Sequence, residues 1–396
     1  MQNTETKKEN KEKELRRHKR YFSIGCAIVK PLSKLLFNYS YEKIPDIDGP
    51  VLILCNHNTD CDCAFLALAA PKQVYFVATE NIARMGLLGK LLIYGFNPIL
   101  HFKGMMGTNT VREILKKTKA GSSVAFFPEG NRSFNGLTNP IPSATGKLAK
   151  MSGATLINYT LEGGYLTCPR WGKGIRKGRI RGKIAGIYTP DDLSKMSSED
   201  ISNAIKRDLF VDAYEDQKVR PVKYIGKDSA LGLESMLFLC PKCNKIGTLK
   251  SGKNSVKCSC GYNATYTPFG FLESPDGSTF DLTSLDNSQR KYISELVKGT
   301  SELFSDEITF RVVDENHSII SESKEKLSAF SDRFKAGEEE FLYSEMDGLA
   351  INQRNLLLVH KKSSDKHYEF EGSISFSALK YLYAARTSFK SASGLL

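Results

Sequence analysis

One histidine early in the chain is spaced for proton transfer with a nearby carboxylate. The segment Asn56-His57-Asn58-Thr59-Asp60-Cys61-Asp62 places His57 ahead of two aspartates. A histidine accepts a proton near neutral pH, and a neighbouring carboxylate fixes its tautomer and stabilises the imidazolium that forms. The segment therefore predicts a group that activates a hydroxyl. Asp62 and Asp60 are both candidate partners, although the place of Asp60 beside Thr59 also suits a helix N-cap.

A second charged motif follows at Phe127-Pro128-Glu129-Gly130-Asn131-Arg132-Ser133. It places a carboxylate and a guanidinium on a glycine-containing loop directly after the apolar stretch 123–127. An arginine in such a loop can bind a phosphate through two parallel hydrogen bonds. Each motif alone has a simpler explanation. A histidine in a surface loop would account for His57, and a structural ion pair at a turn would account for Glu129 and Arg132. Both motifs together, in this order, favour a catalytic site.

Together the two motifs resemble those of the glycerophospholipid acyltransferase superfamily, whose members acylate glycerol 3-phosphate or lysophospholipids. The resemblance covers roughly residues 46–212. It implies that His57 is the general base and that Asp62, which fits the family spacing, holds the imidazole. It further implies that the second motif positions the acceptor, and that either backbone N–H groups near Gly130 or a cationic group stabilises the oxyanion. The implied acceptor-binding residues are Glu129, Gly130, Arg132 and Ser133.

Two further segments of the family pattern add candidate substrate-binding lysines. Residues 95–103 occupy the place of an aromatic segment that ends in arginine, and this chain has His101 or Lys103 there. Residues 142–147 match a motif in which a proline precedes a glycine-containing helix start, which makes Lys147 a candidate phosphate contact. At this position, which the family pattern assigns to phosphate binding, the chain therefore departs from the expected arginine.

The resemblance implies an O-acyltransferase similar to 1-acylglycerol-3-phosphate acyltransferases. It would move a fatty acyl group from acyl-CoA or acyl carrier protein to a hydroxyl of a glycerol phosphate or lysophospholipid in phospholipid synthesis, with lysophosphatidic acid as the leading acceptor. The alternative is a non-catalytic zinc-ribbon protein on a degenerate acyltransferase fold that binds membrane or nucleic acid. The intact His57, Asp62, Glu129 and Arg132 count against it.

Apolar runs alternate with helical patterns after residue 50, which predicts an α/β fold with a central, largely parallel sheet and flanking helices. We expect His57 in a turn between a buried strand at 51–55 and a helix at 60–70. Four parts are predicted. They are a basic leader and membrane-facing helical segment (1–45), an acyltransferase domain (46–230), a zinc ribbon (231–272), and a helix plus β-rich domain with a pleckstrin-homology-like outline (273–396).

Pro31 divides the apolar segment 21–39, which predicts a pair of short helices. They either lie on a bilayer or cover the catalytic core. A helix is also predicted at 197–214, with Ser197 or Ser198 as its cap.

Four cysteines are spaced as metal ligands. Cys240 and Cys243 form one pair, Cys258 and Cys260 form the other, and residues 244–257 between them are rich in Lys, Gly and Ser. Two thiolate pairs at this spacing fit one tetrahedral Zn²⁺ in a zinc ribbon. Four thiolates leave no open position, so the predicted zinc is structural. The alternative is two redox-active or incidental cysteine clusters. The other five cysteines show no pairing pattern and indicate reduced thiols in a cytosolic protein.

The net charge of +12 predicts an anionic partner. Between residues 163 and 183 there is no acidic side chain, and basic residues alternate with Tyr165 and Trp171. Such composition suits a membrane interface and also single-stranded nucleic acid, and the neighbouring motifs favour anionic lipids over nucleic acid. The apolar run 22–29 is too short to span a bilayer. We therefore expect a cytoplasmic protein, attached peripherally to the inner face of the membrane, with a lysophospholipid acceptor and acyl carrier protein among its candidate partners.

Overall fold

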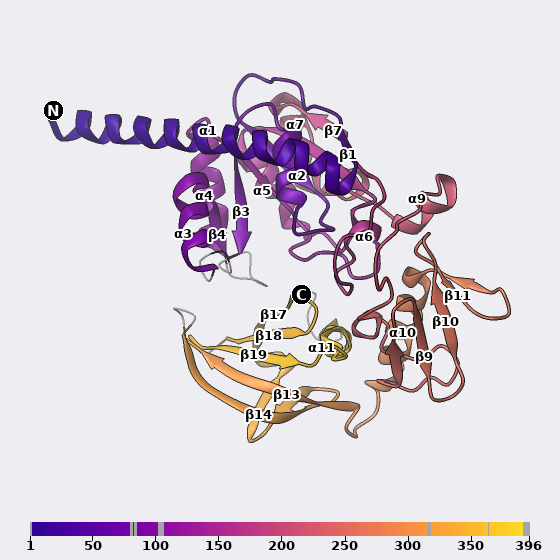
Figure 1. Ribbon diagram of the computed structural model, residues 1–396. Coiled ribbons are helices and arrows are strands. Elements are labelled where there is room, and N and C mark those ends of the chain that lie inside the picture. Colours follow the sequence, from indigo (N-terminus) through magenta and orange to yellow (C-terminus); the bar gives the residue numbers. More distant parts are fainter. Residues whose placement is uncertain are drawn as a thin grey trace. The chain divides into compact units, whose positions relative to one another are not determined.

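The computed structural model describes residues 2–79, 82, 85–101, 107–314, 318–362 and 364–390 (Figure 1). The chain divides into two compact units that are not simple halves. Unit 1 contains residues 1–132, 138–167 and 177–216, and unit 2 contains residues 133–137, 168–176 and 217–396. Two short segments that precede residue 217 therefore fold with the C-terminal unit.

A seven-stranded sheet forms the centre of unit 1 in the order β1-β7-β6-β2-β5-β3-β4. Only β7 and β6 run antiparallel among its neighbouring described strands. This confirms the predicted α/β class with a largely parallel sheet. The strands are β1 Tyr39–Tyr41, β2 Val51–Cys55, β3 Val74–Thr79, β4 Ile99–His101, β5 Ser123–Phe126, β6 Thr155–Glu162 and β7 Ile180–Tyr188.

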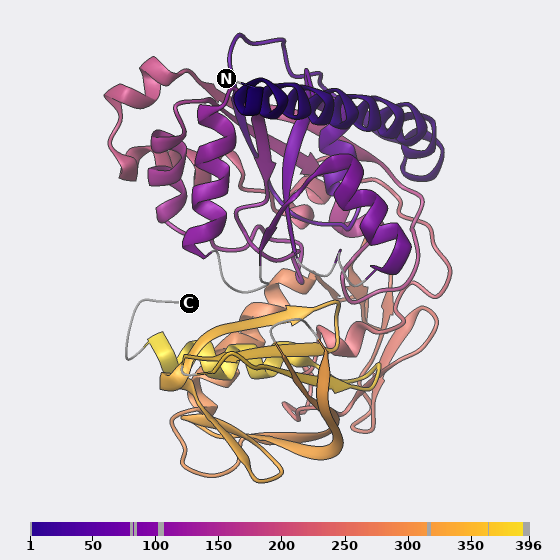
Figure 2. The same ribbon diagram turned by 90° about the vertical axis from the view of Figure 1, so that its left-hand side faces the viewer.

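Helices lie on both faces of this sheet (Figure 2). One core cluster joins alternate residues of β2, Leu52 and Leu54, to side chains of α4, α5 and α8. On the other face α1 packs against α2, where the Phe37 and Phe65 rings meet edge to face at 5.1 Å. The helices are α1 Gln2–Phe37, α2 Asp62–Ala69, α3 Gly86–Phe96, α4 Thr108–Lys119, α5 Ala144–Ser152, α6 Gly164–Thr167, α7 Pro190–Lys195, α8 Ser198–Asp208 and α9 Ala213–Val219.

Helix α1 corrects the prediction of two short helices. It is one helix of 36 residues that continues through Pro31. Proline removes a single backbone donor, and the packing of one face of the helix outweighs that loss. The inner face buries His18, Phe22 and Phe37, while apolar side chains at Ile24 and Leu35 remain exposed on the outer face. No helix within the described ranges combines the length and apolar character needed to cross a bilayer.

Helix α8 begins where the sequence predicts, with a reciprocal capping box between Ser197 and Asp200. It ends at Asp208, earlier than expected, and a separate helix, α9, starts at Ala213. The Thr138 hydroxyl donates to the carbonyl oxygens of Leu209 and Val211. These bonds satisfy backbone acceptors in the break between the helices.

Unit 2 contains two antiparallel sheets. The five-stranded sheet has the order β12-β11-β10-β9-β8, and the seven-stranded sheet has the order β16-β15-β14-β13-β19-β18-β17. The first comprises β8 Leu249–Ser251, β9 Ser255–Cys258, β10 Asn263–Tyr266, β11 Leu272–Glu273 and β12 Thr279–Phe280. The second comprises β13 Phe304–Val313, β14 Ile319–Ala329, β15 Arg333–Ala336, β16 Glu339–Leu342, β17 Met346–Asn352, β18 Leu356–Lys361 and β19 His367–Gly372.

Two α-helices of unit 2 accompany these sheets, α10 Leu282–Leu296 and α11 Ala378–Lys390, and the short 3-10 turns η2 Leu233–Ser235 and η3 Tyr343–Glu345 complete the unit. The β-rich character that the sequence predicts for residues 273–396 is confirmed. The exposed residues of β14 to β16 are mostly charged or small.

The basic aromatic segment also requires a correction, because its central side chains are buried within unit 2. Trp171 is 0% exposed and packs edge to face on Tyr266 at 5.4 Å. The Arg176 guanidinium lies over both of these rings. Arg170 is also buried and donates to backbone carbonyl oxygens of Ile351 and Gln353. The prediction that these three side chains face a membrane is wrong.

Candidate active site and candidate metal centre

The fold brings the two sequence motifs, the His57 segment and the segment with Glu129 and Arg132, to one edge of the parallel sheet. Both β2 and β5 are buried along their whole length, and they are parallel neighbours. Because parallel strands end at the same edge, the loop after β2 and the loop after β5 lie together. The first loop carries His57 into helix α2, and the second carries Glu129 and Arg132. The predicted strand, turn and helix around His57 are confirmed.

His57 pairs with Asp62, as the spacing favours. Its Nδ1 lies 2.9 Å from Asp62 Oδ2, and the imidazole stacks on the Phe127 ring with centroids 4.4 Å apart. The His57 side chain is 23% exposed, whereas Asp62 is buried in the first turn of α2. A buried carboxylate therefore orients a histidine that solvent can reach.

The hydrogen bonds of Asp62 determine the tautomer of His57. Asp62 Oδ2 also accepts the backbone N–H groups of Asn58 at 2.6 Å and Thr59 at 2.8 Å, and Oδ1 accepts the Thr59 hydroxyl at 2.7 Å. The Asn58 and Thr59 backbone N–H groups can only donate, so Asp62 Oδ2 serves as an acceptor. His57 Nδ1 must then carry the hydrogen. The lone pair resides on Nε2, which is the form that a general base needs.

Two asparagines that the sequence analysis does not single out fix this loop to β6. The Asn56 amide exchanges two hydrogen bonds with the backbone of Leu161, donating at 3.0 Å and accepting at 2.7 Å, and the Asn58 amide donates to the same carbonyl oxygen at 3.0 Å. Gly164 lies so close that a Cβ there would stand 3.1 Å from the Cβ of Asn58. The available sequence signal is the run of polar residues directly after the buried strand β2.

Glu129 holds the backbone of the site. Its Oε1 accepts the His57 backbone N–H at 2.6 Å, and its Oε2 accepts the backbone N–H of Asn139 at 2.6 Å and the Asn139 side-chain amide at 3.0 Å. Burial raises the pKa of Glu129 to about 8, although these N–H donors act in the opposite direction. Glu129 thus bridges the His57 loop to Asn139, a partner that the sequence analysis misses. The resemblance implies a different role for Glu129, namely contact with the acceptor.

Arg132 is the cationic group of the second motif, and it pairs with the aspartate that does not hold His57. Arg132 Nη1 lies 3.0 Å from Asp60 Oδ2. The Arg132 side chain is 16% exposed and that of Asp60 is 83% exposed. The two candidate carboxylates are therefore separated in role: Asp62 orients the imidazole, and Asp60 balances the charge of Arg132.

Among the other predicted binding residues, Gly130 and Ser133 are engaged in local hydrogen bonds. The Gly130 N–H donates to the Phe127 carbonyl oxygen at 3.2 Å, which argues against its expected role as an oxyanion donor. Ser133 is buried in unit 2, where its hydroxyl donates to the Leu137 carbonyl oxygen at 2.8 Å. Lys147 is exposed on α5, His101 ends β4, and Lys103 lies outside the described residues.

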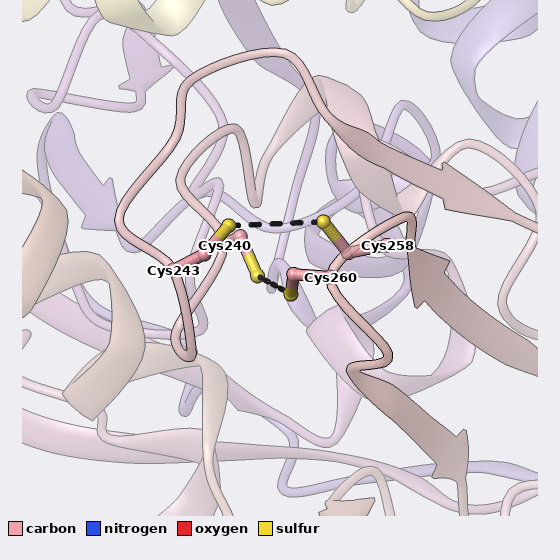
Figure 3. Close-up of side chains that lie close together, drawn as sticks. All are labelled: Cys240, Cys243, Cys258 and Cys260. Carbon is pink, nitrogen blue, oxygen red and sulfur yellow. Dashed lines mark hydrogen bonds between the residues drawn. The ribbon is translucent and has the colours of Figure 1, made fainter.

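The four predicted metal-ligating cysteines converge in unit 2 (Figure 3). Cys240 and Cys243 lie on a turn before β8, and Cys258 and Cys260 lie on the turn from β9 to β10. All four sulfur atoms lie within 4.8 Å of one another, with Cys240 to Cys260 at 3.6 Å and Cys243 to Cys258 at 3.9 Å. Sulfurs of a tetrahedral zinc site are about 3.8 Å apart, since Zn–S bonds are about 2.3 Å long. The donor set and spacing fit zinc.

Comparison with known proteins finds a likeness over the segment that carries both motifs. A family model described as Acyltransferase matches residues 37–162. A chloroplastic 1-acyl-sn-glycerol-3-phosphate acyltransferase of Brassica napus is 25% identical over 135 residues, 34% of this chain and 39% of the relative. Its counterpart in Arabidopsis thaliana is 25% identical over 142 residues, 35% of this chain and 40% of the relative. The chain thus spans about two fifths of the length of these relatives.

A solved structure is also similar. The crystal structure of the 1-acyl-sn-glycerophosphate (LPA) acyltransferase PlsC from Thermotoga maritima aligns with a TM-score of 0.43 and 18% identity. The alignment covers 50% of this chain and 80% of that chain.

Proposed function

Since residues 37–162 belong to the glycerophospholipid acyltransferase superfamily, as their motifs predict, we propose that this protein transfers a fatty acyl group to a hydroxyl of a glycerol phosphate or lysophospholipid. The observation that carries the proposal is the His57–Asp62 pair, in which three donors from Asn58 and Thr59 fix Asp62 as an acceptor. His57 Nε2 is thereby set to take a proton.

The proposed reaction is a single displacement on a thioester. His57 Nε2 removes the proton of the acceptor hydroxyl as the hydroxyl oxygen attacks the thioester carbonyl carbon. The tetrahedral oxyanion then collapses, the carbon–sulfur bond breaks, and the imidazolium returns its proton to the leaving thiolate. Asp62 stabilises the imidazolium between these two transfers.

We assign recognition of the acceptor phosphate to Arg132. Its guanidinium stands in the loop beside the His57 motif and pairs with Asp60, a largely exposed carboxylate. Because solvent surrounds the Asp60 carboxylate and weakens the pair from that side, a phosphate can replace or share the Asp60 contact at small cost. Lysophosphatidic acid is the first acceptor to test, because the curated relatives bear the name 1-acyl-sn-glycerol-3-phosphate acyltransferase. Acyl-CoA and acyl carrier protein are the proposed donors.

We place peripheral membrane attachment on α1 and α3, in place of the buried segment around Trp171. The two helices pack through Tyr21, whose ring meets the rings of Tyr94 and Phe96 edge to face. Both leave apolar side chains exposed, and Leu87 is 85% exposed. An apolar face with basic side chains beside it suits an anionic lipid surface. We call it the α1/α3 face: Ile24, Ile28, Leu32, Leu35, Leu87, Leu88 and Leu91, with Lys30, Lys34 and Lys90.

The four-cysteine cluster is proposed to hold one structural Zn²⁺. Thiolates of Cys240, Cys243, Cys258 and Cys260 would fill all four tetrahedral positions and leave none for water or substrate. Zinc there would stabilise the turns before β8 and after β9.

Acyl transfer by the purified protein tests the proposed function. Parent protein should convert lysophosphatidic acid to the diacylated product with acyl-CoA or acyl carrier protein as donor. His57→Ala should lower turnover by at least about 10²-fold, since a positioned general base contributes that much. Its thermal melt should match the parent's. A parent protein inactive across a panel of lysolipids, or a His57→Ala variant with normal turnover, would contradict the proposal.

A further inference from the structure

The segment that continues the second motif is fixed from the C-terminal half of the chain. We propose that Asp286 of α10 is a positioning residue for acyl transfer, because it holds the segment 133–137 that directly follows Arg132 in the chain. The inference rests on the proposed function and assigns a task to the C-terminal half.

Residues 133–137 form a compact turn. The Ser133 hydroxyl oxygen accepts the Gly136 N–H at 2.9 Å, and the Asn135 side-chain oxygen accepts the Leu137 N–H at 3.0 Å. Gly136 has a φ of 93°, a left-handed conformation that glycine adopts without strain. Ser133 and Asn135 are both buried. The path of the chain beyond Arg132 is thus set by hydrogen bonds.

Helix α10 anchors this turn through both the side chain and the backbone of Asn135. The Asn135 amide donates to Asp286 Oδ2 at 2.9 Å, and the Thr283 hydroxyl donates to the Asn135 carbonyl oxygen at 2.9 Å. Asp286 is 0% exposed. A fully buried carboxylate is costly unless several donors surround it.

Three more donors surround Asp286. Tyr383 of α11 donates its hydroxyl at 2.8 Å, Arg290 Nε lies 2.9 Å from Oδ2, and the Gln289 amide donates to Oδ1 at 3.3 Å. Gln289 Oε1 also accepts the backbone N–H groups of Phe238 and Leu239, just before Cys240. One carboxylate therefore links the turn after Arg132 to both C-terminal helices and to the chain that enters the cysteine cluster.

The consequence for acyl transfer follows from the covalent chain. Arg132 precedes the anchored turn, and Glu129, which holds the His57 backbone, lies in the same loop. If Asn135 loses its anchor, the Arg132 guanidinium is less well placed for the acceptor phosphate, while His57 and Asp62 keep their own contacts. A small displacement of a binding group costs about 10- to 100-fold in kcat/KM. The loss should fall mainly on the KM for the acceptor.

The test is a double-mutant cycle between Asp286 and Arg132. Asp286→Ala should raise the acceptor KM about tenfold with a smaller change in kcat. In an Arg132→Ala background the same substitution should add little, since the residue it positions is already gone. Asp286→Asn, which still accepts from Asn135, should restore part of the loss. Asp281→Ala is the matched control, because it removes the α10 N-cap without touching Asn135.

Unchanged acceptor KM in folded Asp286→Ala, or an undiminished effect in the Arg132→Ala background, would overturn the inference. If Asp286→Ala does not fold, Asn135→Ala replaces it, with the same expectations. Hydrogen exchange of residues 133–139 supplies a readout independent of turnover. Exchange should speed up in Asp286→Ala and not in Asp281→Ala, and equal exchange in the two would also overturn the inference. Failure of the parent enzyme to transfer acyl groups would instead refute the proposed function, and the exchange result would still decide the anchoring.

Discussion

Replacement of Asp62 by asparagine separates the charge of this residue from its hydrogen bonds. In Asp62→Asn the amide oxygen can take the place of Oδ2 and accept from His57 Nδ1, Asn58 N and Thr59 N. The amide nitrogen then takes the place of Oδ1 and donates to the Thr59 hydroxyl, which can turn to accept. The loop should keep its conformation and His57 its tautomer. The negative charge beside the imidazolium is lost, together with the acceptor of the Thr59 hydroxyl.

The size of the kinetic effect follows from that single change. A hydrogen bond to a charged group contributes about 1.5–3 kcal/mol, roughly twice a neutral one, and the imidazolium exists only along the reaction path. The neutral bond that the asparagine keeps retains about half of this, so a loss of about 0.75–1.5 kcal/mol in the transition state corresponds to a roughly 4- to 13-fold lower kcat. The decrease should be smaller than that of His57→Ala. Stability should fall by about 1–3 kcal/mol, since the backbone N–H donors keep an acceptor and only the buried Thr59 hydroxyl loses one.

Asp62→Ala should behave differently, because it leaves buried donors of Asn58 and Thr59 without an acceptor. Each such donor costs about 1–3 kcal/mol, so the variant should lose roughly 3 kcal/mol or more of unfolding free energy.

The assay is mass-spectrometric appearance of diacylated product beside a thermal melt for each variant. Asp48→Asn, which removes an exposed aspartate, is the matched control. Parent-like kcat in Asp62→Asn would show that the carboxylate charge is not used. A melt of Asp62→Asn as low as that of Asp62→Ala would refute the hydrogen-bond reasoning.

Three other predictions concern Glu129, the cysteine cluster and the α1/α3 face. Burial raises the pKa of Glu129 to about 8, so its contribution to stability is full below the unfolded pKa near 4.5 and is lost as pH rises towards 8. Denaturant titrations of the parent should show up to about 1.4 kcal/mol of this loss per pH unit, and Glu129→Gln, which does not titrate, should lack it; identical slopes would contradict the assignment. Elemental analysis should find about one zinc per chain, abolished in Cys243→Ser and kept in the exposed control Cys63→Ser. Retention of zinc in Cys243→Ser would show that the four-cysteine cluster is not the zinc site. Leu87→Ser with Leu91→Ser should weaken sedimentation with anionic liposomes, salt should weaken it further, and the exposed control Phe210→Ser should bind normally. Equal sedimentation of all variants would place the lipid-binding surface elsewhere.

The sequence predicts those parts of the site that depend on local order in the chain. The apolar runs of β2 and β5 identify buried strands, and the polar residues that follow them must then meet at one sheet edge. The spacing from His57 to Asp62 selects the partner that the structure pairs with it. The other contacts around the His57–Asp62 pair are made by residues that only the folded structure brings near it, so the sequence does not reveal them. Asn139 binds Glu129 from another part of the loop, and nothing in the residue types distinguishes it from other surface asparagines.

The buried basic aromatic segment around Trp171 shows why a count of basic residues does not locate a membrane-binding surface. Arg170 and Arg176 belong to a stretch without acidic residues, so no ion pair can be anticipated there. Burial of a guanidinium requires acceptors and flat apolar neighbours, and these come from distant residues: the carbonyl oxygens of Ile351 and Gln353 for Arg170, and the rings of Trp171 and Tyr266 for Arg176. Backbone carbonyl oxygens have no signature in a sequence. An arginine that donates to backbone carbonyl oxygens is therefore predicted from sequence to be a surface residue.

The same reasoning applies to the contacts that assign the segments 133–137 and 168–176 to the C-terminal unit. Asn135 meets Asp286 and Arg170 meets Gln353 across long stretches of chain, through bonds between a side chain and a single distant partner. Periodicity reports which face of a helix is buried, but not what covers it. On α10 the pattern marks Asp286 and Gln289 as interruptions of an apolar face, although both are buried because they bind other segments. A buried polar residue on an otherwise apolar helix face is thus the signal that such a link exists, and its partner has to come from the structure.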